Sequence, residues 1–350
     1  MAKIKEFLKR KDIEFSLKRY GIDALGAMAQ GLFASLLVGT ILSTIGKQFS
    51  IDFLVEIGNF ASAVKGSAMA IAIGYALKAP PLVLFSLAAV GYSADTLGGA
   101  GGPLAVLFIA IIAAEIGKAV SKETKLDILV TPVTTIIVGC GLSMLCAGYI
   151  GTAASAVGNA IMWATELHPF LMGMIVSAIV GIALTLPISS AAICGALSLT
   201  GLAGGAAVAG CCAQMVGFAV MSFKENKWSG LVSQGIGTSM LQMPNIIHNP
   251  RIWIPTILTS AITGPLATCV FGMQMYGEAI NSGMGTCGLL GPIGIILGWF
   301  GGSYPTTVGV MDWIGLALIC FILPAILSLL FSELLYKIKW IKAGDLTLPE

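Results

Sequence analysis

Apolar segments long enough to cross a lipid bilayer recur along the chain from Gly21 to Tyr336. A transmembrane helix needs roughly 20 apolar residues, and a signal peptide would supply only one such segment. The composition agrees, because 57% of the residues are hydrophobic and 10% are charged, whereas soluble proteins carry about 25% charged residues. The chain is therefore predicted to be an all-α polytopic membrane protein with roughly 8–10 crossings or half-crossings, some of them broken by proline and glycine.

Clusters of Lys and Arg predict how the chain is oriented in the membrane. Residues 1–20 contain seven basic residues among apolar ones such as Phe7 and Leu8, a pattern typical of an amphipathic helix on an anionic membrane surface. The same segment could instead only fix the topology, or dock a soluble protein. Further basic clusters lie at 118–125, 224–227 and 337–342. Since cytoplasmic loops are enriched in Lys and Arg, both termini are predicted to be cytoplasmic.

The predicted organisation is a basic N-terminal segment (residues 1–20), one transmembrane transport domain (21–336) and a cytoplasmic tail (337–350). The net charge of +2 is too small to indicate a nucleic-acid partner, so membrane lipid is the expected environment. The chain has no P-loop, kinase signature, nucleophile elbow or dinucleotide fingerprint, and its eight cysteines lack the spacing of a zinc site. No cofactor, no metal and no catalytic motif of its own is predicted, and the cysteines are interpreted as small packing residues.

The stretch from Gly235 to Gly264 carries amides, a histidine and three prolines between two apolar segments. A bilayer tolerates such polar, broken backbone only where protein or a water-filled cavity surrounds it, so this stretch is predicted to line a solute pathway. Its side chains offer the donors and acceptors that a polyol needs, and the histidine could act as a base toward a hydroxyl. The candidate binding residues here are Gln242, Asn245, His248 and Asn249. Asn249 is also expected to cap a helix that begins at Pro250.

Three other broken segments supply further candidates for binding a polar solute. Glycine-rich backbone leaves free N–H groups, and carboxylates, amides and hydroxyls can hydrogen-bond a sugar-like molecule. The candidates are Asp95 and Gly101 in YSADTLGGAGGP, Ser189 and Ser190 in LPISSAA, and Glu278 and Asn281 before SGMGTCG. The alternative interpretation is that these segments are loops outside the membrane or close-packed helix contacts.

Three ionisable residues within or beside the apolar segments were considered for ion coupling. Glu115 lies one turn from Lys118, so it either titrates during transport or forms an ion pair at the end of a span. Glu166 and His168 either form a proton-coupled pair or sit at a solvated interface.

The chain also shows weak internal similarity. A shift of 100 residues aligns Gly39 and Gly58 with Gly139 and Gly158, and both copies would end at a basic edge, which indicates a same-direction repeat. Relative to this repeat, residues 228–249 are an insertion. They are too polar and too interrupted for a lipid-facing helix, so a re-entrant element entering from the cytoplasmic side is predicted.

Three strings, residues 98–118, 186–193 and 242–273, resemble the phosphotransferase-system enzyme IIC-like membrane proteins, in particular the stand-alone EIIC type. The resemblance covers about residues 23–336. It implies a sugar or sugar-like permease of the bacterial inner membrane, a homodimer, and soluble IIA and IIB partners that supply phosphoryl transfer. The chain lacks a IIB-type cysteine domain, a IIA-type histidine domain and the GITEP-like string of the better-known glucose and chitobiose proteins. No sugar-binding residue is therefore carried over by motif.

The leading hypothesis is a permease for a small polar solute, a carbohydrate, acting as the IIC component of a phosphotransferase system. The first alternative is an ion-coupled or facilitative carrier or channel that works without phosphorylation. The second is a membrane sensor or scaffold whose basic residues 1–20 recruit soluble proteins. The polar groups in broken intramembrane segments favour transport, because a scaffold has little use for them.

Overall fold

The computed structural model describes residues 2–300 and 308–348. Within these ranges the chain is helical, and its only β-type pairing is an isolated bridge between Gly201 and Met275. The prediction of an all-α protein is confirmed. The chain divides into two compact units, Met1–Ala153 and Ala154–Glu350, and the division falls inside helix α9. A backbone break also expected from the sequence GGSYP, at residues 301–305, lies outside the described residues.

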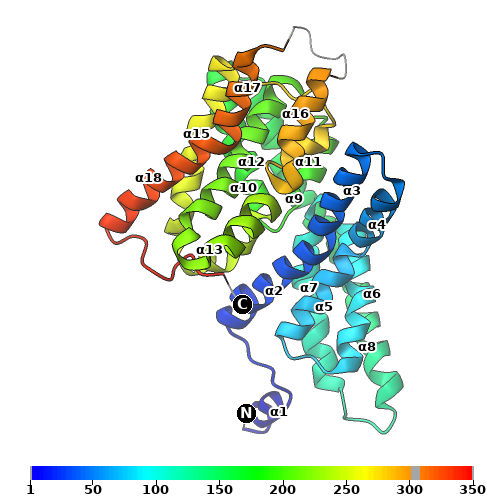
Figure 1. The fold of residues 1–350 in the computed structure, drawn as a ribbon. Coiled ribbons are helices and arrows are strands. Elements are labelled where there is room, and N and C mark those ends of the chain that lie inside the picture. The colour runs from blue at the N-terminus through cyan, green and yellow to red at the C-terminus, as the bar shows by residue number, and fades with distance from the viewer. Residues whose placement is uncertain (1, 301–307, 349–350) are drawn as a thin grey trace. The chain divides into compact units, whose positions relative to one another are not determined.

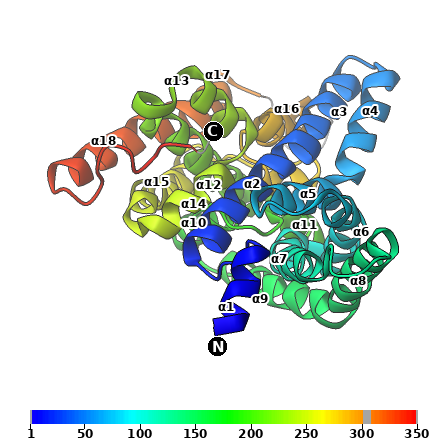
Figure 2. The same ribbon diagram turned by 90° about the horizontal axis from the view of Figure 1, so that it is seen from below.

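Unit 1 is built from helices that pack mostly, but not only, on their neighbours in the sequence. Its helices are α1 (Ala2–Arg10), α2 (Ala24–Leu32), α3 (Val38–Gln48), α4 (Asp52–Ala63), α5 (Lys65–Ala76), α6 (Pro81–Gly98), α7 (Gly102–Val120), α8 (Asp127–Leu142) and the start of α9 (Gly148–Thr165). Helices α3 and α4 lie side by side (Figure 1, Figure 2), and a Cβ atom on Gly58 would overlap the carbonyl oxygen of Gly39. Small residues therefore set this close helix approach.

Proline and glycine break the unit 1 helices where the sequence indicated. Helix α5 ends before Lys78, and α6 begins at Pro81, because proline cannot donate within a helix. Gly99 ends α6 in a left-handed conformation, with φ of 51° that glycine adopts freely, and α7 then packs back on α6. The glycine-rich run is thus a tight turn between two buried helices.

Unit 2 surrounds one helix, α12, which is buried along nearly its whole length. Its helices are α10 (Pro169–Thr185), α11 (Ser190–Ala196), α12 (Gly201–Met221), α13 (Phe223–Val232), α14 (Met243–His248), α15 (Ile254–Pro265), α16 (Leu290–Phe300), α17 (Val310–Ala317) and α18 (Leu323–Lys337). Helices α10, α15 and α18 pack against α12 (Figure 1). A Cβ atom on Gly210 would overlap the carbonyl oxygen of Ser177 on α10. The small side chains of α12 allow its neighbours to approach on all sides.

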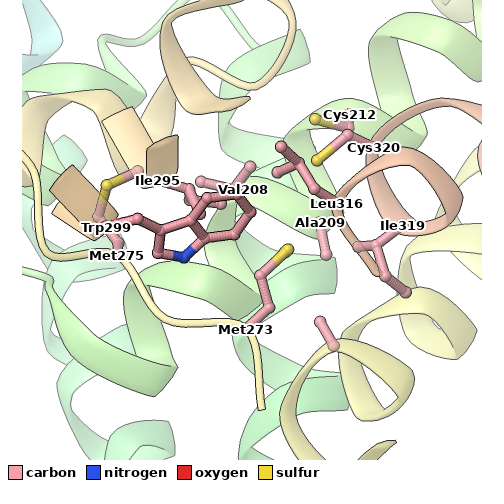
Figure 3. Close-up of a cluster of buried hydrophobic side chains, with 11 residues drawn as sticks. Val208, Ala209, Cys212, Met273, Met275, Ile295, Trp299, Leu316, Ile319 and Cys320 are labelled. Atoms are coloured by element: carbon pink, nitrogen blue, oxygen red, sulfur yellow. The ribbon is translucent and has the colours of Figure 1, made fainter. Parts of the chain in front are cut away.

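A cluster of buried apolar side chains joins α12 to the C-terminal helices of unit 2 (Figure 3). Val208 and Cys212 on α12 contribute to it, together with Trp299 at the end of α16 and Ile319 after α17. The extended segment around Met273 and Met275 passes through the same cluster. Burial of this apolar surface stabilises the packing of the C-terminal helices on the unit, by roughly 25 cal/mol per Å² of apolar surface removed from water.

Six helical segments in the described part of the chain are long and apolar enough to cross a membrane: Lys18–Gln48, Pro81–Val120, Asp127–Thr165, Gly201–Met221, Pro250–Val270 and Val310–Lys337. Two further apolar helices, Pro169–Thr185 and Cys287–Phe300, are shorter. The segment Pro81–Val120 has 40 residues, about twice the length of one crossing, and it turns at Gly99. The polytopic membrane protein predicted from the sequence is therefore confirmed.

The contacts of the aligned glycines do not follow the proposed repeat. Gly39 packs against Gly58 within unit 1. Their counterparts do not meet in the same way, because Gly139 packs against Val90 and Gly158 against Leu197. The same-direction repeat stays a prediction.

Candidate functional site

The predicted pathway stretch in unit 2 is a chain of short helical pieces. After α13 come a π-helical turn (Ser233–Gly237), a 3-10 turn (Ser239–Gln242) and the short helix α14. None of these pieces is long enough to span a bilayer. This confirms that the inserted residues do not form a lipid-spanning helix, whereas their re-entrant placement in the membrane stays a prediction.

Asn249 has the capping role that the sequence predicted. Its Oδ1 atom accepts a hydrogen bond from the Arg251 backbone N–H at 3.3 Å, and Pro250 occupies the first helical position. A short 3-10 turn starts there and leads directly into α15. The proline needs no N–H partner at this position, so the cap and the proline together start the helix.

Three amide side chains form a continuous hydrogen-bonded row, which we name the amide chain: Gln234, Gln242 and Asn245. Gln242 Nε2 donates to Gln234 Oε1 at 2.9 Å, and Asn245 Nδ2 donates to Gln242 Oε1 at 2.8 Å. Gln234 in turn donates to Ser222 Oγ at 2.7 Å. Both glutamines are fully buried, so their amide groups need these partners. Gln234 was not among the sequence candidates, although a polar residue in an apolar, glycine-broken stretch could have indicated it.

The amide chain binds a C-terminal segment of the same chain. Residues 340–348, which we name the C-terminal strap, lie across it. Gln242 Nε2 donates to the Leu346 carbonyl at 3.0 Å, and Asn245 Nδ2 donates to the Thr347 carbonyl at 2.9 Å. Asn249 Nδ2 donates to the Trp340 carbonyl at 3.0 Å and to Asp345 Oδ2 at 2.7 Å. Three of the predicted solute-binding side chains therefore bind a peptide segment.

Helix α13 also binds the strap. The Glu225 carboxylate accepts hydrogen bonds from the backbone N–H groups of Gly344 at 2.8 Å and Leu346 at 2.9 Å. Asn226 donates to the Leu346 carbonyl at 2.8 Å and accepts from the Leu348 N–H at 2.9 Å. The Leu346 side chain is completely buried, which anchors the strap. The sequence predicts only a cytoplasmic tail for these residues, because nothing in their composition indicates a contact with α13.

A second buried polar cluster surrounds Gln214 in the middle of α12. Its Oε1 atom accepts from Trp253 Nε1 and Thr256 Oγ1, each at 2.9 Å, and its Nε2 donates to Ser260 Oγ at 3.3 Å. Thr185 lies 3.4 Å from the same Oε1 atom. Gln214 was missed by sequence reasoning. A single amide within an apolar span is nevertheless the type of residue that marks a functional or packing site in membranes.

Asp95 and Gly101, the candidates of unit 1, lie at the turn between α6 and α7. Lys65 Nζ is 3.6 Å from Asp95 Oδ2, while the buried Oδ1 atom has no hydrogen-bond partner in the described chain. Gly101 is buried, and a Cβ atom there would lie 2.8 Å from the Ile150 carbonyl oxygen. The turn thus presents one unsatisfied acceptor oxygen and no space for a side chain at residue 101.

The serine and Glu278–Asn281 candidates come together in unit 2. Ser189 Oγ caps α11 by accepting from the Ala192 N–H at 3.2 Å, and Ser190 Oγ donates to the Gly283 carbonyl at 2.7 Å. This bond joins the start of α11 to the 3-10 turn Ala279–Gly283, which contains Asn281. Glu278 is exposed. The serine hydroxyls therefore have structural partners.

The predicted ionisable candidates occupy different environments. Glu115 Oε2 is 3.0 Å from Lys118 Nζ, which is the span-end pair foreseen as one of its two interpretations. Tyr20 also donates to Glu115 at 3.1 Å. His248 and His168 are exposed, as is Glu166. His248 has no side-chain hydrogen bond to any residue in the described ranges, so the amide chain does not include it, and its role as a base stays a prediction.

The residues described by the structure contain no group of three or more His, Cys, Asp or Glu side chains that could hold a metal ion. All eight cysteines are free thiols, and five of them are buried. The buried polar clusters around Gln214 and along the amide chain are made mainly of amides and hydroxyls, which donate and accept hydrogen bonds without titrating.

Comparison with protein-family models matches residues 22–348 to the family described as the phosphotransferase system, EIIC. No curated protein and no solved structure matches the chain significantly. The family match covers both units, apart from the N-terminal residues and the last two residues. Together with the apolar helices and the buried amides, it shows that this chain belongs to the EIIC family of phosphotransferase-system membrane components.

Proposed function

We propose that this protein carries a carbohydrate across the bacterial inner membrane as the IIC component of a phosphoenolpyruvate-dependent phosphotransferase system. The observation that carries the proposal is the family match over residues 22–348. EIIC proteins work with IIA and IIB partners, and the absence of a P-loop agrees with a phosphoryl donor that comes from outside the chain. We further propose that the protein is a homodimer with both termini in the cytoplasm.

Each unit, taken by itself, carries hydrogen-bonding groups that we propose for solute binding. In unit 1, Asp95 Oδ1 accepts no hydrogen bond from any described residue, so it is an acceptor to which a solute hydroxyl could donate. In unit 2, Gln242 and Asn245 donate to carbonyl oxygens of the strap. A sugar hydroxyl accepts hydrogen bonds in the same way, so a solute can take these donors when the strap leaves. Five of the other sequence candidates, Gly101, Ser189, Ser190, Glu278 and Asn281, are assigned to shaping the broken segments, while Asn249 caps the turn before α15 and His248 stays a candidate base.

Uptake into proteoliposomes tests the coupling to phosphorylation. The purified protein is reconstituted with the cognate IIA and IIB proteins, the general phosphocarrier enzymes and phosphoenolpyruvate enclosed, and radiolabelled sugars and polyols are supplied outside. We expect one class of solute to accumulate as its phosphate ester, and only when the donor is enclosed. Accumulation of free solute under a proton or sodium gradient, with no donor present, would instead establish the ion-coupled alternative.

Alanine substitution tests the proposed site. Gln242→Ala and Asn245→Ala each remove donors that the solute would use, so we expect loss of solute binding with folding retained, and His248→Ala tests the predicted base. Asn59→Ala is the matched control, because Asn59 is an exposed amide on α4. Unchanged uptake and affinity in the variants at 242, 245 and 248 would remove the site assignment without affecting the family membership.

A further inference from the structure

Unit 1 contains a strongly basic cavity that the proposed transport function does not use. It has a volume of about 370 Å³ and lies where the end of α1, the turn after α5 and the end of α7 meet. Its walls carry five basic residues, Arg10, Lys11, Lys78, Lys118 and Lys122, against two carboxylates. The lining therefore has an excess of positive charge, which favours an anionic occupant.

Both carboxylates of this cavity are already paired with neighbouring cations. Asp12 Oδ2 is 2.9 Å from Arg19 Nη2, and Glu123 Oε1 is 2.7 Å from Arg10 Nη2 and 2.5 Å from Lys11 Nζ. Asp12 also interacts electrostatically with Lys78, and the Asp127 carboxylate accepts from the Lys122 backbone N–H at 2.6 Å, but among the described residues neither Asp12 nor Asp127 forms an ion pair with a lysine Nζ atom. In residues 2–300 and 308–348, the Nζ atoms of Lys78 and Lys122 have no hydrogen bond or ion pair.

Capping of the nearby helices does not account for these two lysines. A cation near a helix C-terminus is stabilised by the free carbonyl groups there. At the end of α5, however, the Leu77 carbonyl already accepts from Arg19 and Lys118, each at 2.9 Å. At the end of α7, the Ser121 carbonyl already accepts from Lys11. These two carbonyl groups are satisfied by other side chains, and within residues 2–300 and 308–348 the ammonium groups of Lys78 and Lys122 have no hydrogen-bond partner.

The backbone at both lysines is held in an unfavourable conformation. Lys78 has φ of 55° and Lys122 has φ of 60°, and Asp12, on the same cavity, has φ of 52°. Glycine adopts such angles without cost, whereas a residue with a side chain loses roughly 1 kcal/mol. Asp12 and Lys78 end helices α1 and α5 in this conformation, and Lys122 lies in the turn after α7, so the positive φ angles belong to the helix ends that form the cavity wall.

We propose that this cavity binds the phosphate group of an anionic ligand, with Lys78 and Lys122 as its principal donors and Arg10 at its rim. Phosphate oxygens accept several charge-assisted hydrogen bonds at once, and two unpaired ammonium groups supply these donors. The cavity adjoins Lys118, near the end of the predicted span Pro81–Val120. The phosphate can belong to a lipid headgroup at the membrane surface or to a soluble phosphate.

Binding measurements with two probes distinguish these sources. In one arm, the full-length protein in uncharged detergent is mixed with phosphatidylglycerol or phosphatidylethanolamine, and bound lipid is counted by native mass spectrometry. In the other arm, binding of radiolabelled inorganic phosphate is measured by equilibrium dialysis at constant ionic strength. We expect saturable binding of either phosphatidylglycerol or phosphate, and about tenfold weaker binding in Lys78→Asn/Lys122→Asn. Asparagine tolerates a left-handed backbone, so this variant removes charge without adding strain.

The matched control is Lys227→Asn/Lys339→Asn. Both residues are exposed lysines with left-handed φ, at 50° and 58°, and neither lines the cavity. The control should bind either probe like the wild type. Equal binding by the two double variants, or no saturable binding of either probe by the wild type, would overturn the proposal. Because neither readout involves transport, these results do not depend on the proposed sugar uptake.

Discussion

At the scale of single residues, Gln214 shows how a buried amide is satisfied in a helix of small apolar residues. The side chains that donate a hydrogen bond to Gln214 or accept one from it differ in whether they have a second partner. Thr256 also donates to the Trp253 carbonyl at 3.0 Å, and Ser260 also donates to the Thr256 carbonyl at 2.9 Å. The Trp253 Nε1–H group has only the Gln214 oxygen as its acceptor among the described residues. The cost of removing the amide should therefore come mainly from the indole N–H.

The change Gln214→Leu tests this assignment. It leaves one partly buried N–H group without an acceptor, so we expect unfolding free energy to fall by about 1–3 kcal/mol. The measurement is the thermal midpoint of the purified protein in detergent, followed by intrinsic fluorescence. The double variant Gln214→Leu/Trp253→Phe removes both partners and should recover much of the loss. Met215→Leu, a volume-conserving change on the same buried helix, is the control. A midpoint for Gln214→Leu equal to that of Met215→Leu would contradict the argument.

The ion pair between Asp12 and Arg19 makes the N-terminal segment sensitive to acid. The hydrogen bond from the Arg19 guanidinium lowers the pKa of Asp12 below its ordinary value of 3.8. A carboxyl group whose pKa is lower in the folded protein contributes stability above its unfolded pKa. That contribution is lost as pH falls through the lower, folded pKa. The pair should therefore stabilise the protein fully above about pH 4 and progressively less below it.

A comparison of pH profiles measures this contribution. The thermal midpoints of the wild type and Asp12→Asn should differ by a constant amount from pH 7 to about pH 4, and the difference should close on further acidification. Asn tolerates the left-handed φ of residue 12, so backbone strain does not enter. Glu14→Gln changes an exposed carboxyl two residues away and serves as the control. A constant difference down to pH 3 would show that the pair does not determine the acid response.

At the scale of elements, the C-terminal strap links α13 to the amide chain through backbone hydrogen bonds. Its contacts are to main-chain N–H and carbonyl groups at residues 340, 344 and 346–348, together with the Asp345 and Thr347 side chains. Sequence reasoning cannot find such contacts, because backbone groups are identical in every peptide segment. It did locate the amides that make them. Gln242, Asn245 and Asn249 stand out as polar residues in an apolar stretch and are predicted to bind a solute, whereas their hydrogen bonds to the strap are found only in the structure.

The substitution Glu225→Ala should release the strap. It removes the acceptor of two backbone N–H groups, and each charge-assisted bond contributes about 1.5–3 kcal/mol. Opening of the strap should therefore increase at least about tenfold, and trypsin should cleave faster after Lys342. Intact-mass analysis would detect the loss of residues 343–350. In the control, Glu333→Ala removes an exposed ion pair with Lys224 and should leave the cleavage rate unchanged. Equal cleavage rates in the two variants would show that Glu225 does not hold the strap.

At the scale of the whole molecule, the basic clusters found in the sequence meet in pairs, one pair in each unit. In unit 1, Arg10 pairs with Glu123 and Lys118 donates to the Asp12 carbonyl at 2.6 Å, so the N-terminal segment lies against the end of α7. In unit 2, Glu225 binds the strap that contains Lys342, so the 224–227 cluster lies beside the C-terminal segment. The charge pattern in the sequence predicts, for each cluster separately, the side of the membrane on which it lies. Which clusters lie together could be found only in the structure, because it depends on the turn at Gly99 between α6 and α7 and on the contacts of the strap.

The pairing makes a topology prediction that reporter fusions can check. If the positive-inside rule holds, the N-terminus, residues 122–125, residues 224–227 and the C-terminus are all cytoplasmic. Fusions of a fluorescent protein that folds only in the cytoplasm, placed at residue 1, at residue 124 or after residue 350, should fluoresce. Alkaline phosphatase at the same positions should be inactive. At a position one apolar crossing away, alkaline phosphatase should be active and the fluorescent protein dark. Within unit 1, residue 1 and residue 124 must report the same side whatever the orientation of the protein, since Arg10 and Glu123 are in contact. Opposite reports from those two positions would show that the helices of unit 1 do not fold as described.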